Sequence, residues 1–192
     1  LGSMPAAVAA IVDETQAEGD LWVLNDPYRG GTHLPDVTLI SPVFAEEELI
    51  GFATSRAHHA DIGGETPGGM PAFSTRLEQE GVVIPPTRAD DEVLRSLAER
   101  MRNPDQRLAD FRAQRAANLT GITRMRELYS RHGREPLREG MAEILDYAER
   151  RTRAALAALP DGDGKAVDRL EAADGTEIVL RLQDGEKTFL SI

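Results

Sequence analysis

The stretch that decides the fold runs from residue 37 to residue 55 and reads VTLISPVFAEEELIGFATS. Two apolar, β-branched segments, 37–44 and 49–55, flank an acidic break at 46–48. Strand-forming residues on both sides of a short polar connection predict an antiparallel β-hairpin. The residues just before the first strand and just after the second should then lie side by side at the open end of the hairpin.

The rest of the first region, 1–89, predicts short elements separated by glycine-rich loops. A helix is expected over 6–16, because Pro5 suits a first helical turn and Gly19 lies just beyond the end. Short apolar runs at 21–24 and 81–84 predict two further strands. The segments 25–31 and 61–71 are rich in glycine and other turn residues, which indicates loops.

The second region, 90–159, is poor in glycine and proline and predicts three helices. Asp90 or Asp91 should cap the first helix, Pro104 should open the second and Pro136 the third. One long apolar face is expected on the second helix, formed by Leu108, Phe111, Ala116, Leu119, Ile122, Met125 and Leu128. Two long helices with a short connection favour an antiparallel helical hairpin.

The third region, 160–192, predicts a β-hairpin, with strands at 176–182 and 188–192 around an Asp-Gly turn. We expect all three regions to belong to one larger domain. The fold class is therefore α+β: a mostly antiparallel sheet with glycine-rich loops plus a long helical hairpin.

Composition narrows the possible chemistry. The chain has 192 residues, a formal net charge of −11 at pH 7 and no cysteine. So acidic a chain is poorly suited to nucleic acids or anionic membranes, and no apolar run approaches the ~20 residues of a membrane helix. Without cysteine, thiolate nucleophiles and cysteine-based zinc sites are excluded. These features suit a cytoplasmic protein whose metals would have nitrogen and oxygen ligands.

Three of the four histidines lie where predicted strands meet glycine-rich loops. His33 and Asp36 precede the first hairpin strand, and His58 follows the second. If the hairpin forms, all three come together at its open end. Two imidazoles and one carboxylate can hold a divalent ion and leave positions for water or substrate. The alternative is that these histidines are only hydrogen-bonded loop residues, because no metal-ligand signature such as H-E-x-x-H is present.

Other catalytic motifs are missing from the sequence. Neither glycine pair, Gly30-Gly31 or Gly63-Gly64, lies in a phosphate-binding G-x-x-x-x-G-K-[ST] or G-x-G-x-x-G motif, so no nucleotide site is expected in this chain. There is also no G-x-S-x-G nucleophile elbow.

Four blocks of the sequence resemble the hydantoinase B family, which includes 5-oxoprolinases and acetone carboxylase-type subunits. The first block is NDPY-x-GGTHLPD at 25–36, and the second is SRAHHADIGG with PG-x-MP at 55–71. The third block, 80–86, and the fourth, D-x-RAQ-x-AAN-x-TG at 110–121, follow in the expected order. The first residues, LGSMP, also look native to the family. The resemblance weakens after Pro160, and we expect the chain to be a fragment or a shortened member.

The resemblance implies an ATP-linked, metal-dependent amidohydrolase that acts on cyclic amides of the hydantoin, 5-oxoproline or lactam type. ATP would be bound by a hydantoinase A-type partner subunit in a hetero-oligomer, and not by this chain. The family's metal ligands carry over to His33, Asp36 and His58, for Zn, Mn or Fe, with a further aspartate ligand expected upstream of residue 1.

Further site residues are expected around these ligands. His59 and Asp61 are candidates for orienting ligands or moving protons, and Glu80 is a weaker catalytic candidate. Candidate substrate-binding residues are Arg56, Gly63 and Gly64. Two alternatives stay open: a ketone carboxylase subunit of the acetone or acetophenone type, and a truncated, non-catalytic assembly module. A free-standing iron oxygenase is a weaker alternative, since its ligands usually form a tighter motif.

Overall fold

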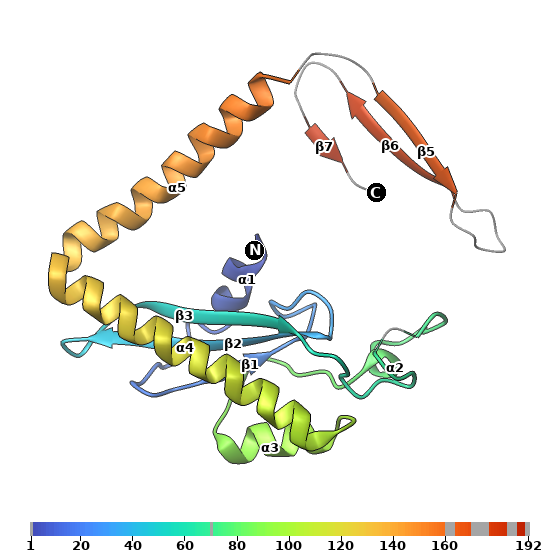
Figure 1. Ribbon diagram of the computed structural model, residues 1–192, viewed down its shortest axis with the longest axis horizontal. Coiled ribbons are helices and arrows are strands. Elements are labelled where there is room, and N and C mark those ends of the chain that lie inside the picture. Colours follow the sequence, from blue (N-terminus) through green and yellow to red (C-terminus); the bar gives the residue numbers. More distant parts are fainter. Residues whose placement is uncertain (1, 70, 160–163, 170–176, 184–187, 191–192) are drawn as a thin grey trace. The chain divides into compact units, whose positions relative to one another are not determined.

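The computed structural model describes residues 2–69, 71–159, 164–169, 177–183 and 188–190 (Figure 1). The chain divides into two compact units, Leu1–Arg134 and Glu135–Ile192. Within the described residues, no helix is both long and apolar enough to cross a membrane.

The first unit is built on a four-stranded antiparallel sheet with the order β3-β2-β1-β4. The strands are β1 (Trp22–Leu24), β2 (Asp36–Ala45), β3 (Glu48–His58) and β4 (Thr87–Arg88). The predicted hairpin is therefore confirmed as β2 and β3, which pair from Asp36↔His58 to Ala45↔Glu48. Glu46 and Glu47 form its turn with φ of 51° and 66°, the left-handed pair that matches the twist of the two strands.

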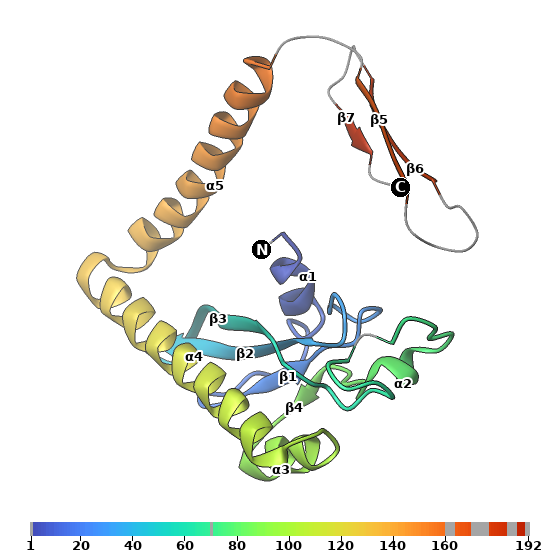
Figure 2. The ribbon, with the colours of Figure 1, turned by 45° about the vertical axis from the view of Figure 1, so that its right-hand side comes forward.

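Helices cover both faces of this sheet (Figure 2). On one face, Val23, Val37 and Leu39 pack with Leu94 and Phe111, which belong to α3 (Asp91–Glu99) and α4 (Pro104–His132). On the other face, the neighbouring strand residues pack against α1 (Met4–Ala9) and the turn after it, in a cluster of Ala7, Ile11, Trp22, Leu24 and Ile40. This division follows the two-residue period of a strand.

The N-terminal helix is shorter than predicted, because it ends at Ala9 instead of reaching residue 16. Gln16 explains the difference. Its side-chain amide donates to the carbonyl of Ile11 and accepts a hydrogen bond from the indole of Trp22. These contacts hold the segment after α1 in turns that bury Ile11.

The predicted strand at 81–84 is wrong. Gly81 makes only an isolated bridge with Gly63, and Ile84 bonds to Asn25 instead of to a strand ladder. The strand β4 follows the two prolines at 85–86, and a short helix that was not expected, α2 (Leu77–Glu80), precedes this segment.

The helices α3 and α4 form where they were predicted, and Asp90 caps α3 by accepting from the backbone N–H groups of Glu92 and Val93. The third predicted helix begins at Arg134, two residues before the expected start at Pro136. The expected apolar face of α4 is only partly correct. Its buried residues include Leu108 and Phe111 but also three polar residues, Arg107, Gln114 and Asn118. By contrast, Leu119 and Leu128 are 55% and 42% exposed.

The second unit contains α5 (Arg134–Ala157), apart from its first residue, and a three-stranded antiparallel sheet. Its strands are β5 (Gly164–Arg169), β6 (Glu177–Gln183) and β7 (Thr188–Leu190), in the order β5-β6-β7. The strands β6 and β7 match the predicted hairpin. Its Asp-Gly turn lies outside the described residues, and β5 was not predicted.

Candidate functional site

His33, Asp36 and His58 come together at the open end of the β2–β3 hairpin. Asp36 and His58 are the last paired residues of the ladder. His33 Nε2 lies 3.3 Å from Asp36 Oδ2, and the ring centroids of His33 and His58 are 5.1 Å apart. Thr32 donates from its hydroxyl to the same Asp36 oxygen at 2.8 Å. The cluster is accessible, because the side chains of His33 and Asp36 are 44% and 25% exposed.

The loop before β2 is shaped by short-range hydrogen bonds. Asp26 accepts from the backbone of Tyr28 through its carboxylate and from Gly31 through its carbonyl. A Cβ at residue 31 would lie 2.2 Å from the carbonyl oxygen of Asn25, so only glycine fits there. The tight turn of this loop places His33 just before the first residue of β2, where the carbonyl of His33 accepts from the Asp36 N–H.

The donor set of this cluster fits a divalent cation, since two imidazole nitrogens and a carboxylate oxygen are common ligands. In the geometry found, no group of three or more His, Asp or Glu side chains among the described residues is arranged to hold a metal ion. Within the cluster, the side chains of His33 and Asp36 contact each other directly. Binding a cation would therefore require these side chains to turn from each other toward the ion.

His59 lies next to this cluster in sequence but is buried, with 2% of its surface exposed. Its Nε2 is 2.9 Å from Gln114 Oε1, and its ring packs on Phe111 at 5.0 Å between centroids. Burial lowers the pKa of His59 below its ordinary value, against the raising effects of the Gln114 hydrogen bond and the Asp110 charge. The imidazole is therefore neutral near pH 7, and its buried Nδ1 has no hydrogen-bond partner among the described residues.

Asp61 organises the second glycine-rich loop. Its two carboxylate oxygens accept from the backbone of Gly63 at 2.7 Å and of Gly68 at 2.9 Å, and Arg102 contacts both oxygens at 3.2 Å. Burial alone would raise the pKa of Asp61, but the hydrogen bonds from Gly68, Gly63 and Arg102 outweigh it and leave this pKa below its ordinary value. A carboxylate held ionised in this way fixes the loop and is a poor proton donor at neutral pH.

The remaining predicted site residues make contacts within the protein. The guanidinium of Arg56 donates to Thr38 at 2.7 Å, to Ser3 and to the carbonyl of Gly30. Glu80 accepts from the hydroxyl of Ser74 at 2.8 Å.

Gly63 and Gly64 lie against backbone, because a Cβ at these positions would lie 2.7 Å from Arg100 O and 2.4 Å from Glu80 O. Both glycines therefore permit close packing of the loop beside Asp61.

Sequence reasoning gave no role to Asn25, Gln114 or Asn118, which are buried and bonded to backbone groups of β2 and its surroundings. A signal was present for the last two. Gln114 and Asn118 are four residues apart and follow Phe111 at helical spacing, so these amides lie on the buried face of α4.

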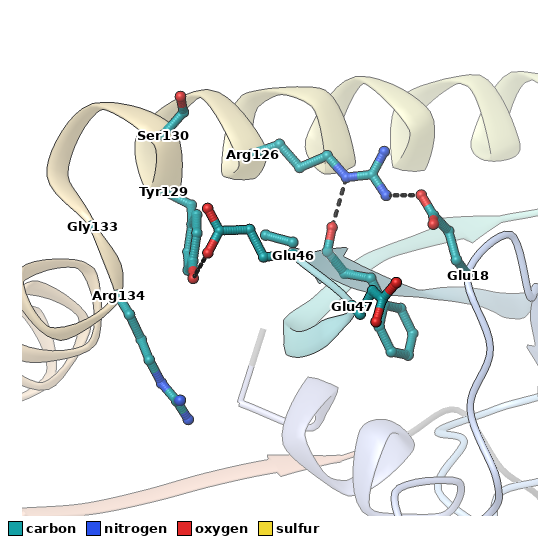
Figure 3. Close-up of a pocket in the computed structure, with 10 residues that line it drawn as sticks. Glu18, Glu46, Glu47, Arg126, Tyr129, Ser130, Gly133 and Arg134 are labelled. Atoms are coloured by element: carbon teal, nitrogen blue, oxygen red, sulfur yellow. Dashed lines mark hydrogen bonds and ion pairs between the residues drawn. The ribbon is translucent and has the colours of Figure 1, made fainter.

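A hollow of about 670 Å³ lies at the other end of the hairpin, beside the Glu46–Glu47 turn (Figure 3). Arg126 crosses it, donating to the carbonyl of Phe44 at 2.8 Å and pairing with Glu18. The hydroxyl of Tyr129 donates to Glu46 at 3.4 Å. The β2–β3 ladder separates this hollow from the histidine cluster, so the two are independent features.

Comparison with known proteins agrees with this architecture. A sequence profile of the Hydantoinase B/oxoprolinase family matches residues 1–191. A 5-oxoprolinase of Dictyostelium discoideum is 37% identical over 97% of this chain and 16% of its own length. The acetophenone carboxylase delta subunit of Aromatoleum aromaticum is 31% identical over 78% of this chain and 23% of its own length.

Among solved structures, the ATP-dependent caprolactamase of Pseudomonas jessenii superposes with a TM-score of 0.77 and 29% identity, over 95% of this chain and 34% of that chain. The α+β fold of this chain is therefore shared with a solved structure over most of its length. The chain belongs to the Hydantoinase B/oxoprolinase family. It spans well under half the length of these relatives.

Proposed function

We propose that this chain supplies the divalent-cation site of an ATP-dependent complex that hydrolyses cyclic amides. The observation that carries the proposal is the convergence of His33, Asp36 and His58 at the open end of one hairpin. A divalent ion held there would lower the pKa of a bound water and polarise an amide carbonyl. Such chemistry suits a cyclic amide of the hydantoin, 5-oxoproline or lactam type.

The residues around the cluster would hold the loops that frame it. Thr32 orients the Asp36 carboxylate, and Asp61 fixes the second loop through Gly63 and Gly68. The Nδ1 of neutral His59 is the atom through which this residue would accept a proton. Substrate contacts would come from Glu80, Arg56 and the Gly63–Gly64 backbone. To contact substrate, these groups would give up the bonds that they make within the protein.

ATP would be used by a partner, because this chain has none of the phosphate-binding motifs. A hydantoinase A-type subunit is the proposed partner. Its activation of the substrate amide would leave the cation site to deliver water. Relatives named as subunits, such as the acetophenone carboxylase delta subunit, support assembly into a hetero-oligomer.

The same relative supports a second candidate, a ketone carboxylase subunit. The two candidates differ in product. A cyclic amidase opens the ring of 5-oxoproline, a hydantoin or a lactam, whereas a carboxylase incorporates labelled bicarbonate into a ketone.

The test combines metal content with turnover. The wild-type chain, His33→Ala, His58→Ala and the control His132→Ala would be loaded with Mn²⁺ or Zn²⁺, desalted and analysed for metal, then assayed with an A-type subunit and ATP. The control histidine is exposed at the end of α4. Metal and activity should disappear together in the two cluster variants only. Full metal content in both folded cluster variants would refute the assigned ligands, and activity without bound metal would refute the mechanism.

A further inference from the structure

Two buried amide side chains of α4 attach this helix to the backbone of β2. Gln114 Nε2 donates to the carbonyl of Val37 at 3.0 Å, and Asn118 Nδ2 donates to the carbonyl of Leu39 at 3.1 Å. The two residues are one helical turn apart and are 6% and 2% exposed. Buried polar groups of this kind lie in an apolar layer at a cost, which these hydrogen bonds offset.

Gln114 also determines which ring nitrogen of His59 carries the hydrogen. The carbonyl oxygens of Val37 and, at 3.4 Å, Ser55 lie beside its amide nitrogen, and carbonyl oxygens only accept hydrogen bonds. The amide nitrogen must therefore point toward the strands, and Oε1 must face His59. Because Oε1 also only accepts, the Nε2 of His59 carries the hydrogen and Nδ1 carries the lone pair.

The bonds of this single amide end next to two of the proposed cation ligands. Val37 follows Asp36 in the chain, and His59 follows His58. Beyond the last ladder pair, Asp36↔His58, the strand ends are joined by one further backbone bond, from His59 N–H to Pro35 O at 2.8 Å. Gln114 thus bridges the two strand ends at the point where pairing stops and where the strands would otherwise separate first.

We propose that Gln114 is a positioning residue for the cation site. It holds His59 as the Nε2–H tautomer and keeps the ends of β2 and β3 together, and in this way sets the spacing of Asp36 and His58. Its importance for catalysis rests on the proposed function, whereas its effect on His59 and on the strand ends is a property of the chain alone.

Asn118 provides the matched control. It lies on the same helix face, is equally buried and bonds to the same strand through Leu39 and Ser41. Its bonds fall farther from the strand end and do not involve a histidine. If both amides only attach α4 to β2, loss of the Gln114 amide and loss of the Asn118 amide should have the same consequences.

The experiment compares wild type with Gln114→Met and Asn118→Leu, which keep the shape of each side chain and remove its polar atoms. Long-range ¹H–¹⁵N spectra of the metal-free, ¹⁵N-histidine-labelled chain report the tautomer of His59. Amide hydrogen exchange reports the His59 N–H, and titration with Mn²⁺ or Zn²⁺ reports the Kd. Gln114→Glu is a second variant, because it keeps an acceptor for His59 but loses the donor to Val37.

In Gln114→Met, we expect the imidazole of His59 to lose its single Nε2–H tautomer. The backbone N–H of His59 should exchange about fivefold faster or more, as loss of one hydrogen bond predicts. The metal Kd should rise by about 10- to 100-fold, the usual effect of removing a group that orients ligands. Asn118→Leu should lower thermal stability but keep the tautomer, the exchange rate and the Kd. Gln114→Glu should keep the tautomer and still weaken metal binding.

An unchanged tautomer in Gln114→Met, or equal changes in the Gln114→Met and Asn118→Leu variants, would overturn the proposal. If Gln114→Met does not fold, Gln114→Glu decides: an unchanged His59 N–H exchange rate there would overturn it. A wild-type chain that binds no metal would refute the proposed function, and the tautomer and exchange measurements would still decide the role of Gln114.

Discussion

Asn25 pairs with the backbone of Ile84 through its side-chain oxygen and its own backbone N–H, in the way that a neighbouring strand would. Asn25 Oδ1 accepts from the Ile84 N–H at 2.6 Å, and the Asn25 N–H donates to the Ile84 carbonyl at 2.9 Å. The side-chain Nδ2 of Asn25 donates to the carbonyls of Leu34 and Val82 at 2.8 and 2.9 Å. This fully buried residue therefore joins the loop before His33 to the segment that follows α2.

Replacing Asn25 with Ala should destabilise the fold by about 2–4 kcal/mol, because three buried backbone groups lose their partner. Urea unfolding followed by circular dichroism measures this change. Asn118→Ala is the control, since among the described residues the Asn118 side chain bonds through its amide nitrogen alone and should lose less. Equal losses in the two variants would contradict the role given to Asn25.

The pairing of Asn25 with Ile84 also shows why the segment 81–84 could not be predicted from local sequence. Its apolar residues are typical of a strand, and both Val82 and Ile84 are indeed buried. Its backbone N–H groups instead donate to the Asn25 side chain and to the carbonyl of Ile62, and its carbonyls accept from Asn25. Nothing within the segment encodes these distant partners.

Elements whose signals are local were predicted well. The β2–β3 hairpin follows from two strand-forming runs around an acidic turn, and α3 follows from its Asp90 cap. The convergence of His33, Asp36 and His58 followed from the hairpin alone. The burial of Gln114 was missed, because a polar residue on a helix is normally assigned to the solvent face, although its helical spacing from Phe111 placed it on the buried face.

Asp61 should make stability depend on pH in the acid range. Its pKa is lowered in the folded chain, so the unfolded chain binds the proton more tightly. Its contribution is therefore complete above the ordinary value of 3.8 and is lost as the pH falls from there through the folded pKa. We expect Asp61→Asn to reduce stability near pH 7 and to show a shallower loss below about pH 4 than wild type.

Urea unfolding at a series of pH values measures this dependence, with the exposed Asp13→Asn as the control. The control should follow the wild-type curve. A wild-type-like slope in Asp61→Asn would mean that other carboxylates cause the acid loss.

Two glycines should respond in opposite ways to alanine. A Cβ at Gly31 would meet the carbonyl oxygens of Asn25 and Asp26 at 2.2 and 2.6 Å, whereas a Cβ at Gly140 would have nothing within 4 Å. Gly31→Ala should destabilise the protein by about 2–3 kcal/mol because backbone must move. Gly140→Ala, inside α5, should stabilise its helix by about 0.5–1 kcal/mol. Thermal unfolding of both variants against wild type checks the two signs, and a Gly31→Ala variant as stable as wild type would contradict the close approach.

Cation binding at the hairpin end should raise thermal stability, because an ion that binds only the folded chain stabilises it by mass action. At a free concentration of 100 times the Kd, the gain is about 2.7 kcal/mol, which corresponds to a rise of about 5–10 °C for a chain of this size. Differential scanning fluorimetry with Mn²⁺ or Zn²⁺, then with excess EDTA, measures the rise and its reversal. His132→Ala should keep the full rise, while His33→Ala and His58→Ala should lose it. An equal rise in all three variants would mean that the ion binds elsewhere, and the hairpin end would then have no part in metal binding.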